Sequence, residues 1–294
     1  MFEKILVATD FSESSRSAWF AAISLAARSL ARIEILHVVT YKQYVFDPAH
    51  YAVPDDKWQS RLKEEMDNQY PSRLYPNSSR YILFSESVPD AILDFAEKQA
   101  CNLIIVGTHD RKMLGRMLMG SVAQQVVRNS KVPVMVVKAS EHQHESLQNY
   151  NRILVPTDFS EASMKALNWS VRYANFLQAD FHLLHVVDLA SYSDVITMYS
   201  LTEAELPKSC ELNVDLSLNM MLDDKELIGK RFVKSLFGDP AAEIVSYAEK
   251  ENCGFIVMGT HGRKGLERIL LGSITAGVIS QSRIPVITMS ESSL

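Results

Sequence analysis

Residues Ile5–Glu13 read ILVATDFSE, and almost the same string returns at Ile153–Glu161 as ILVPTDFSE. The second string begins 148 residues after the first, and the same shift carries Leu36–Val39 onto Leu184–Val187, both LHVV. A short apolar run that ends in Thr-Asp is typical of a strand buried on both faces of a parallel sheet. The chain therefore contains one structural unit written twice.

Strand-like runs and helical spacing alternate along the first copy. Ser12 or Ser14 offers an N-cap for a first helix. The apolar residues of that helix recur at helical spacing and are Trp19, Ile23, Ala26 and Leu30. Strands are expected at Ile5–Ala8, Ile33–Val39, Tyr81–Phe84, Leu103–Val106 and Pro133–Val137, and further helices at Pro89–Ala100 and Gly120–Asn129. This alternation predicts an α/β protein with two tandem doubly wound domains, each with a five-stranded parallel sheet.

The domain limits follow from a polar, aperiodic stretch in the middle of the chain. We expect domain 1 at 1–139, a linker at 140–151 and domain 2 at 152–294. Two stretches differ between the copies, Tyr41–Pro76 with a helix around Trp58–Gln69, and Asp188–Asp224. The second is expected to cover the flank of its own domain; a groove for a partner or lipid is the alternative.

Composition narrows the class of protein. With 294 residues, 47% hydrophobic and 22% charged, each half can bury a core. The net charge of −5 comes without a long basic run, which argues against nucleic acid as a partner. No membrane-length apolar stretch and no signal peptide are evident, so a cytoplasmic location is expected. The cysteines, Cys101, Cys210 and Cys253, have no disulfide or metal spacing and are expected to be reduced packing residues.

The strongest motif is the stretch Gly259–Ser273, GTHGRKGLERILLGS, which directly follows an expected strand. Glycines let backbone N–H groups approach phosphate oxygens, and Gly272-Ser273 opens a helix whose positive end attracts anions. Arg263 and Lys264 can add charge-assisted contacts, and Ser273 can donate its hydroxyl. The alternative is that the glycines only make turns. The carboxyl ends of the strands, where ligands bind in such sheets, lie beside this loop.

The spacing Gly259-x2-Gly262-x9-Gly272-Ser273 resembles the Gly-x2-Gly-x9-Gly-Ser/Thr motif of nucleotide-binding members of the universal stress protein family. Val155–Asp158 and His185-Val186 are also similar to that family. The resemblance covers both copies. It implies a tandem universal stress protein whose domains have the adenine nucleotide alpha hydrolase-like fold.

The resemblance also implies an ATP site in the second copy, with Mg²⁺ as an allowed companion of the nucleotide and no metal held by the protein itself. Asp158 would meet the adenosine portion, and Val186 and Met258 would line the base pocket. The phosphates would be held by Gly259, Gly262, Gly272, Ser273 and Ile274. The remaining expected site residues are Pro156, Thr157, His261 and Arg263.

The first copy departs from the motif, because Asp110 stands where the second glycine should be. Its degenerate site comprises Asp10, Val38, Gly107, Asp110, Gly120 and Ser121. A carboxylate about 4 Å from a phosphate costs about 1 kcal/mol in water and about 4 at an effective dielectric near 20. That cost corresponds to roughly ten- to thousandfold weaker binding. We therefore expect the first copy to bind ATP poorly or not at all.

Three functions compete. A nucleotide-binding regulatory module of the stress response is favoured over a slow ATPase, because no Walker sequence and no base for activating water are evident. His109 and His261 lack a partner at a recognisable spacing, so no catalytic residue is assigned. A scaffold that binds no nucleotide is the third reading. The last strands would be exposed apolar edges, which predicts self-association through them. The family resemblance implies that these edges pair the two domains within the chain, and a homodimer is possible.

Overall fold

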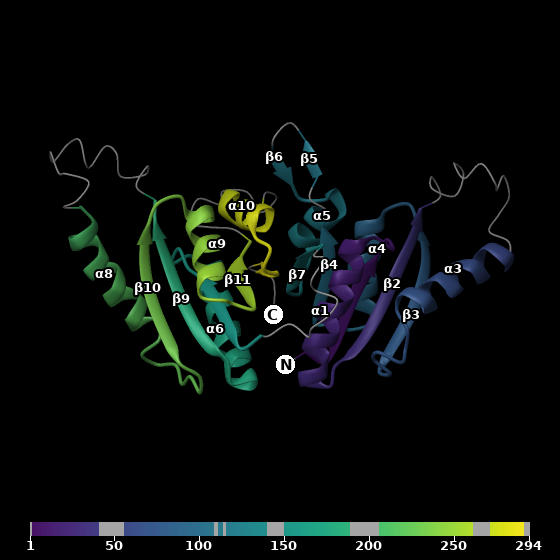
Figure 1. The fold of residues 1–294 in the computed structure, drawn as a ribbon, viewed down its shortest axis with the longest axis horizontal. Coiled ribbons are helices and arrows are strands. Elements are labelled where there is room, and N and C mark those ends of the chain that lie inside the picture. Colours follow the sequence, from purple (N-terminus) through teal and green to yellow (C-terminus); the bar gives the residue numbers. More distant parts are fainter. Residues whose placement is uncertain are drawn as a thin grey trace. The chain divides into compact units, whose positions relative to one another are not determined.

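The computed structural model describes residues 2–40, 56–108, 111–113, 116–139, 150–188, 206–260 and 271–290. The chain divides into two compact units, Met1–Gln148 with Ser293–Leu294, and Asn149–Ser292. Figure 1 shows the elements of each unit.

The first unit is built on five parallel strands in the order β3-β2-β1-β4-β7. The strands are β1 (Lys4–Thr9), β2 (Arg32–Thr40), β3 (Ser78–Ser85), β4 (Leu103–Thr108) and β7 (Val134–Lys138). Chain order runs outward in both directions from the β1–β4 pair. This is the switch point at whose carboxyl edge ligands bind in open α/β sheets.

Helices cover both faces of this sheet. They are α1 (Glu13–Ser29), α3 (Asp56–Gln69), α4 (Val88–Lys98) and α5 (Ser121–Asn129). A Cβ on Gly107 of β4 would point at α1, whereas Thr108 accepts a hydrogen bond from the N–H of Gly120, where α5 begins. Because successive strand residues point to opposite faces, α1 and α5 lie on opposite sides of the sheet. The loop after β4 adds a small antiparallel hairpin of β5 (Arg111–Met113) and β6 (Arg116–Leu118).

The second unit repeats the plan, with five parallel strands in the order β10-β9-β8-β11-β12. They are β8 (Arg152–Pro156), β9 (Asp180–Val187), β10 (Arg231–Phe237), β11 (Phe255–Gly259) and β12 (Val286–Met289). Its helices are α6 (Glu161–Leu177), α8 (Leu206–Met220), α9 (Pro240–Lys250) and α10 (Ser273–Gln281). The predicted fold class, two tandem domains with five-stranded parallel sheets, is confirmed.

The described part of the second unit's divergent stretch, 206–224, covers the flank of its own domain, as predicted. α8 packs against β10 and β9, and Leu218 and Leu222 are fully buried. Its opposite side is open to solvent, with Leu216 and Met220 exposed.

Two local expectations differ from the structure. Trp19, Ile23 and Ala26 are buried on α1, but Leu30 is 82% exposed. Leu30 ends the helix in the left-handed conformation, which turns its side chain away from the apolar stripe. Tyr150, inside the expected linker, is fully buried and packs edge-to-face on Phe255 of the second unit.

Candidate functional site

A rigid turn joins β8 to α6 in the second unit. Thr157 follows the strand, and its hydroxyl accepts a hydrogen bond from the N–H of Phe159 at 3.0 Å. Phe159 has a φ of 63°, a left-handed conformation that is uncommon for a bulky residue. The N–H of Ser160 donates to Asp158 Oδ1 at 3.1 Å, and the Ser160 hydroxyl caps α6. The turn thus holds the Asp158 carboxylate at the carboxyl edge of the sheet.

The neighbouring strand braces this turn through a histidine. Nδ1 of His185 lies 2.7 Å from the carbonyl oxygen of Thr157, and its ring lies 4.9 Å from the ring of Phe159. A carbonyl only accepts, so Nδ1 carries the proton. The predicted base-pocket residue Val186 is next along β9.

β11 delivers the glycine motif to the same edge. Met258 is buried, and a Cβ on Gly259 would lie 2.8 Å from the Cβ of Ala162 and 3.0 Å from its carbonyl carbon. Gly259 is therefore required for the close approach of α6 to the sheet. Its carbonyl accepts from the Thr275 hydroxyl at 2.8 Å, which ties the end of β11 to the first turn of α10.

The start of α10 has the features of an anion site. Gly272 is the N-cap, and no side chain caps this helix among the described residues. The four helices α1, α4, α6 and α9, in contrast, each have a Ser or Asp side chain as cap. The first-turn N–H groups of α10 therefore lack the side-chain acceptor that these four helices have. The first unit repeats this start in the part of the chain that the structure describes, because α5 begins at Gly120 without a side-chain cap. Ser273 and Ile274 in this turn are exposed.

The predicted site residues fall into two groups. Those that the structure describes are Pro156, Thr157, Asp158, Val186, Met258, Gly259, Gly272, Ser273 and Ile274, and all lie at the carboxyl ends of β8, β9 and β11 or at the start of α10. His261, Gly262 and Arg263 lie outside the described residues. The three strand ends and the helix start carry the chemistry that a nucleotide needs: a carboxylate, apolar walls and backbone N–H groups.

The first unit has the same turn after its first strand, whereas the sequence of its loop after β4 differs from that of the second unit. Phe11 has a φ of 65°, and Nδ1 of His37 lies 2.8 Å from the carbonyl oxygen of Thr9. Burial lowers the pKa of His37, so its ring is neutral at pH 7. Of the degenerate set, Asp10 and Ser121 are exposed and Val38 is buried, while Asp110 lies outside the described residues.

The role of Tyr70 was not predicted from the sequence. Its side chain is fully buried beside the turn between β1 and α1 of the first unit. Its hydroxyl is hydrogen-bonded to the hydroxyl of Thr9 and lies 3.3 Å from that of Ser15. In the second unit the corresponding Thr157 and Ser163 hydroxyls bond each other at 3.0 Å. A tyrosine that follows a polar helix carries no local signal of this contact.

Cysteine chemistry is not indicated for either described cysteine. Burial is the main cause that raises the pKa of both Cys101 and Cys253 to about 12, so both remain thiols at neutral pH. This agrees with the packing role expected from sequence. Cys210 lies in the part of α8 whose side chains are not described. Within the described residues, no group of three or more His, Cys, Asp or Glu residues could hold a metal ion.

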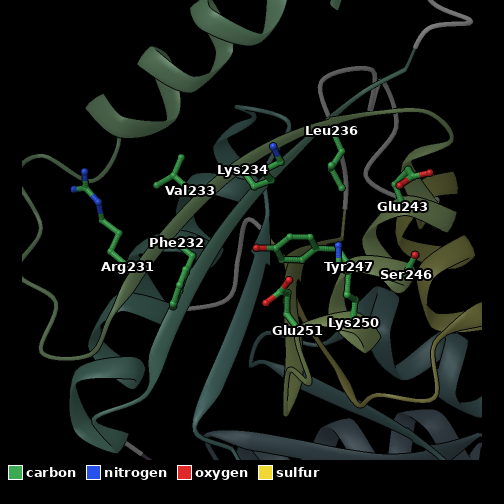
Figure 2. Close-up of a pocket in the computed structure, with 10 residues that line it drawn as sticks. All are labelled: Arg231, Phe232, Val233, Lys234, Leu236, Glu243, Ser246, Tyr247, Lys250 and Glu251. Atoms are coloured by element: carbon green, nitrogen blue, oxygen red, sulfur yellow. The ribbon is translucent and has the colours of Figure 1, made fainter.

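An open groove of about 580 Å³ lies elsewhere on the second unit, between β10 and α9 (Figure 2). Figure 2 shows Phe232 and Lys234 on the strand facing Tyr247 and Glu251 on the helix. Beneath it, the buried ring of His182 stacks on Phe232 at 4.4 Å, and its Nδ1 lies 3.0 Å from the Tyr247 hydroxyl. The groove contains none of the predicted site residues and mixes both signs of charge, so the loop edge remains the stronger candidate.

No helix in the described residues is long and apolar enough to cross a membrane.

Comparison with known proteins gives consistent matches. The model of one family, described as the universal stress protein family, matches residues 1–138 and again residues 149–289. A universal stress protein of Methanocaldococcus jannaschii is 34% identical over 144 residues, which is 48% of this chain and 82% of that protein. One of Mycobacterium bovis is 25% identical over 301 residues, or 98% of this chain and 97% of its own. The crystal structure of a universal stress protein from Archaeoglobus fulgidus has the same fold, with a TM-score of 0.67 and 19% identity over 98% of both chains.

Proposed function

Because the chain belongs to the universal stress protein family, we propose that it is a nucleotide-dependent regulatory module whose second unit binds ATP. One observation carries most of the weight. α10 starts at Gly272 without a side-chain cap, and the Gly272 N–H donates to the carbonyl of Thr260 at 2.8 Å, next to the end of the strand beside the Asp158 turn. An uncapped helix start at this edge of a parallel sheet suits a phosphate group.

Each described residue has a distinct part in the proposed site. The Asp158 carboxylate accepts hydrogen bonds from ribose hydroxyl groups, and Val186 and Met258 line the wall for the base. Backbone N–H groups of Ser273 and Ile274 donate to phosphate oxygens, and the Ser273 hydroxyl adds a further donor. Gly259 keeps α6 close enough for the turn to reach the same space.

The undescribed loop supplies the remaining parts of the proposal. Gly262 lets the backbone approach the phosphates without a Cβ clash. Arg263 makes charge-assisted contacts with phosphate oxygens, and His261 orders the loop. Mg²⁺ arrives with the nucleotide and neutralises part of its charge.

Binding rather than turnover is proposed. The sequence has no Walker motif, and no base for activating water is evident in it. The module would instead act as a regulator. Nucleotide binding would fix the conformation of the loop between β11 and α10, and a partner would bind this nucleotide-bound form. Self-association through the last strands, β7 and β12, stays a prediction.

Isothermal titration tests the proposal. Mg²⁺-ATP is titrated into the nucleotide-stripped chain, into Gly262→Asp, which imitates the first unit, and into Gly115→Asp, which makes the same change in the first unit's loop. We expect one site per chain, weakened roughly ten- to thousandfold by Gly262→Asp. Gly115→Asp should leave it unchanged.

Two results would contradict the proposal. No binding in the parent chain, checked by a second method, would favour the scaffold without nucleotide. Stoichiometric ADP release during the titration would favour the slow ATPase.

A further inference from the structure

The turn after the first strand of each unit is held in an unfavourable backbone conformation by the same set of contacts. Phe11 and Phe159 both have left-handed φ angles, 65° and 63°. Bulky residues avoid this region, so such a conformation persists only where surrounding contacts over-determine it. Both units have this left-handed conformation at the same position, so it is not a chance distortion of one turn.

Three contacts fix the turn in the second unit. The N–H of Phe159 donates to the Thr157 hydroxyl at 3.0 Å. The carbonyl of Thr157 accepts from Nδ1 of His185 at 2.7 Å. The rings of Phe159 and His185 lie 4.9 Å apart, so the histidine contacts the turn through its ring face and its ring nitrogen.

These contacts fix the position of Asp158, the residue between Thr157 and Phe159. Asp158 is flanked by Thr157 and Phe159, and its Oδ1 accepts from the N–H of Ser160 at 3.1 Å. With both neighbours and one carboxylate oxygen fixed, the direction of the carboxylate is set before any ligand arrives. A preorganised acceptor loses little entropy on binding.

We propose that His185 and Phe159 form a positioning pair that makes the site selective for ribonucleotides over deoxyribonucleotides. The inference rests on the proposed nucleotide site. A carboxylate held in one direction bonds a ribose hydroxyl well, and it loses that hydrogen bond when the hydroxyl is missing. Neither residue touches the nucleotide in this role; both act through Asp158.

The test compares Mg²⁺-ATP with Mg²⁺-2′-deoxy-ATP and Mg²⁺-3′-deoxy-ATP on the full chain. The parent chain is expected to prefer ATP over at least one deoxy analogue by about tenfold, the size of one charge-assisted hydrogen bond. His185→Phe keeps a ring against Phe159 but removes the N–H donor. It should lower the preference to about twofold by weakening ATP while leaving the deoxy analogue nearly unchanged, whereas a merely structural defect would weaken both equally.

Two further variants complete the experiment. His185→Asn places an amide N–H near the position of Nδ1, and it should keep more of the preference than His185→Phe; it also carries the test if the phenylalanine variant does not fold. His37→Phe makes the matched change in the first unit and should leave the preference intact.

The outcomes separate the two proposals. A parent chain that binds ATP and both deoxy analogues equally, or a His185→Phe variant with the parent's preference, would overturn the positioning pair while the nucleotide site stands. A loss of preference in His37→Phe would also overturn it. A parent chain that binds none of the three nucleotides would remove the nucleotide site and the positioning pair together.

Discussion

The two units agree closely in the turn after their first strand and differ in the loop after their fourth. In the turn, the histidine Nδ1 to threonine carbonyl distances are 2.8 Å in the first unit and 2.7 Å in the second, and both phenylalanines are left-handed. In the loop, the first unit has Asp110 where the second has Gly262. The turn is part of how strand and helix are joined, whereas Gly262 is proposed to serve a ligand. A unit can therefore lack the loop glycine and keep its fold, as the first unit does.

The described part of the first unit's loop also has backbone structure that bears on phosphate binding. In the first unit, Arg111–Met113 pairs with Arg116–Leu118 as a hairpin. Backbone N–H groups that pair in a ladder are not available to phosphate oxygens. We therefore expect both the charge of Asp110 and this backbone pairing to oppose phosphate binding in the first unit.

The largest expected effect concerns the glycine that both units keep. A Cβ at Gly107 would lie 2.5 Å from the backbone carbon of Ser14, whereas a Cβ at Gly259 would first meet the side chain of Ala162 at 2.8 Å. Both contacts are with atoms fixed to a helix backbone, and those at Gly107 are shorter, so Gly107→Ala should cost about 3 kcal/mol of unfolding free energy and Gly259→Ala about 2. Urea unfolding measures both.

Tryptophan fluorescence distinguishes the units in that experiment, because Trp169 is the only tryptophan of the second unit and Trp19 and Trp58 belong to the first. The control is Gly120→Ala, whose Cβ would contact only the Thr108 hydroxyl at 3.7 Å. It should cost less than about 1 kcal/mol. If Gly107→Ala and Gly120→Ala lowered the unfolding free energy equally, the close approach of α1 would not be the reason that position 107 requires a glycine.

The features that can be predicted from the sequence are those that depend on patterns in the sequence itself. The tandem α/β plan was predictable because repeated strings and buried strands are local patterns. Gly259 was assigned to phosphate binding from the same kind of pattern, yet the structure gives it a packing role against α6 that arises from residues far away in the chain. Tyr70 was missed for the same reason, since its partner Thr9 is 61 residues away. The roles of Gly262 and Arg263 stay predictions.

An intermediate effect is expected when the first unit is given the missing glycine. Asp110→Gly removes a carboxylate from the loop and should strengthen Mg²⁺-ATP binding in the first unit by at least about tenfold. Titration into a chain that also carries Gly262→Asp isolates this unit. No gain would assign the loss of binding to the β5–β6 hairpin rather than to charge.

The smallest expected effect comes from one buried position that differs between the units. His182 on β9 pairs with Leu154 as Glu34 on β2 pairs with Leu6, so the two side chains occupy equivalent places. Both are 1% exposed. Burial lowers the pKa of His182; Glu251 and Asp180 oppose this and Arg152 adds to it.

The sign of the pH dependence follows from that shift. The unfolded chain takes up the proton near the ordinary histidine pKa of 6.5, and the folded unit takes it up only at lower pH. Because the unfolded state binds more protons in this window, unit two is most stable above pH 6.5 and loses stability as the pH falls below it. His182→Phe keeps a ring on Phe232 and removes the titration, so its unfolding free energy should fall less than that of the parent between pH 7.5 and 5.5. Urea unfolding followed at Trp169 measures the difference, and parallel pH profiles in parent and variant would show that burial does not disfavour protonation of His182.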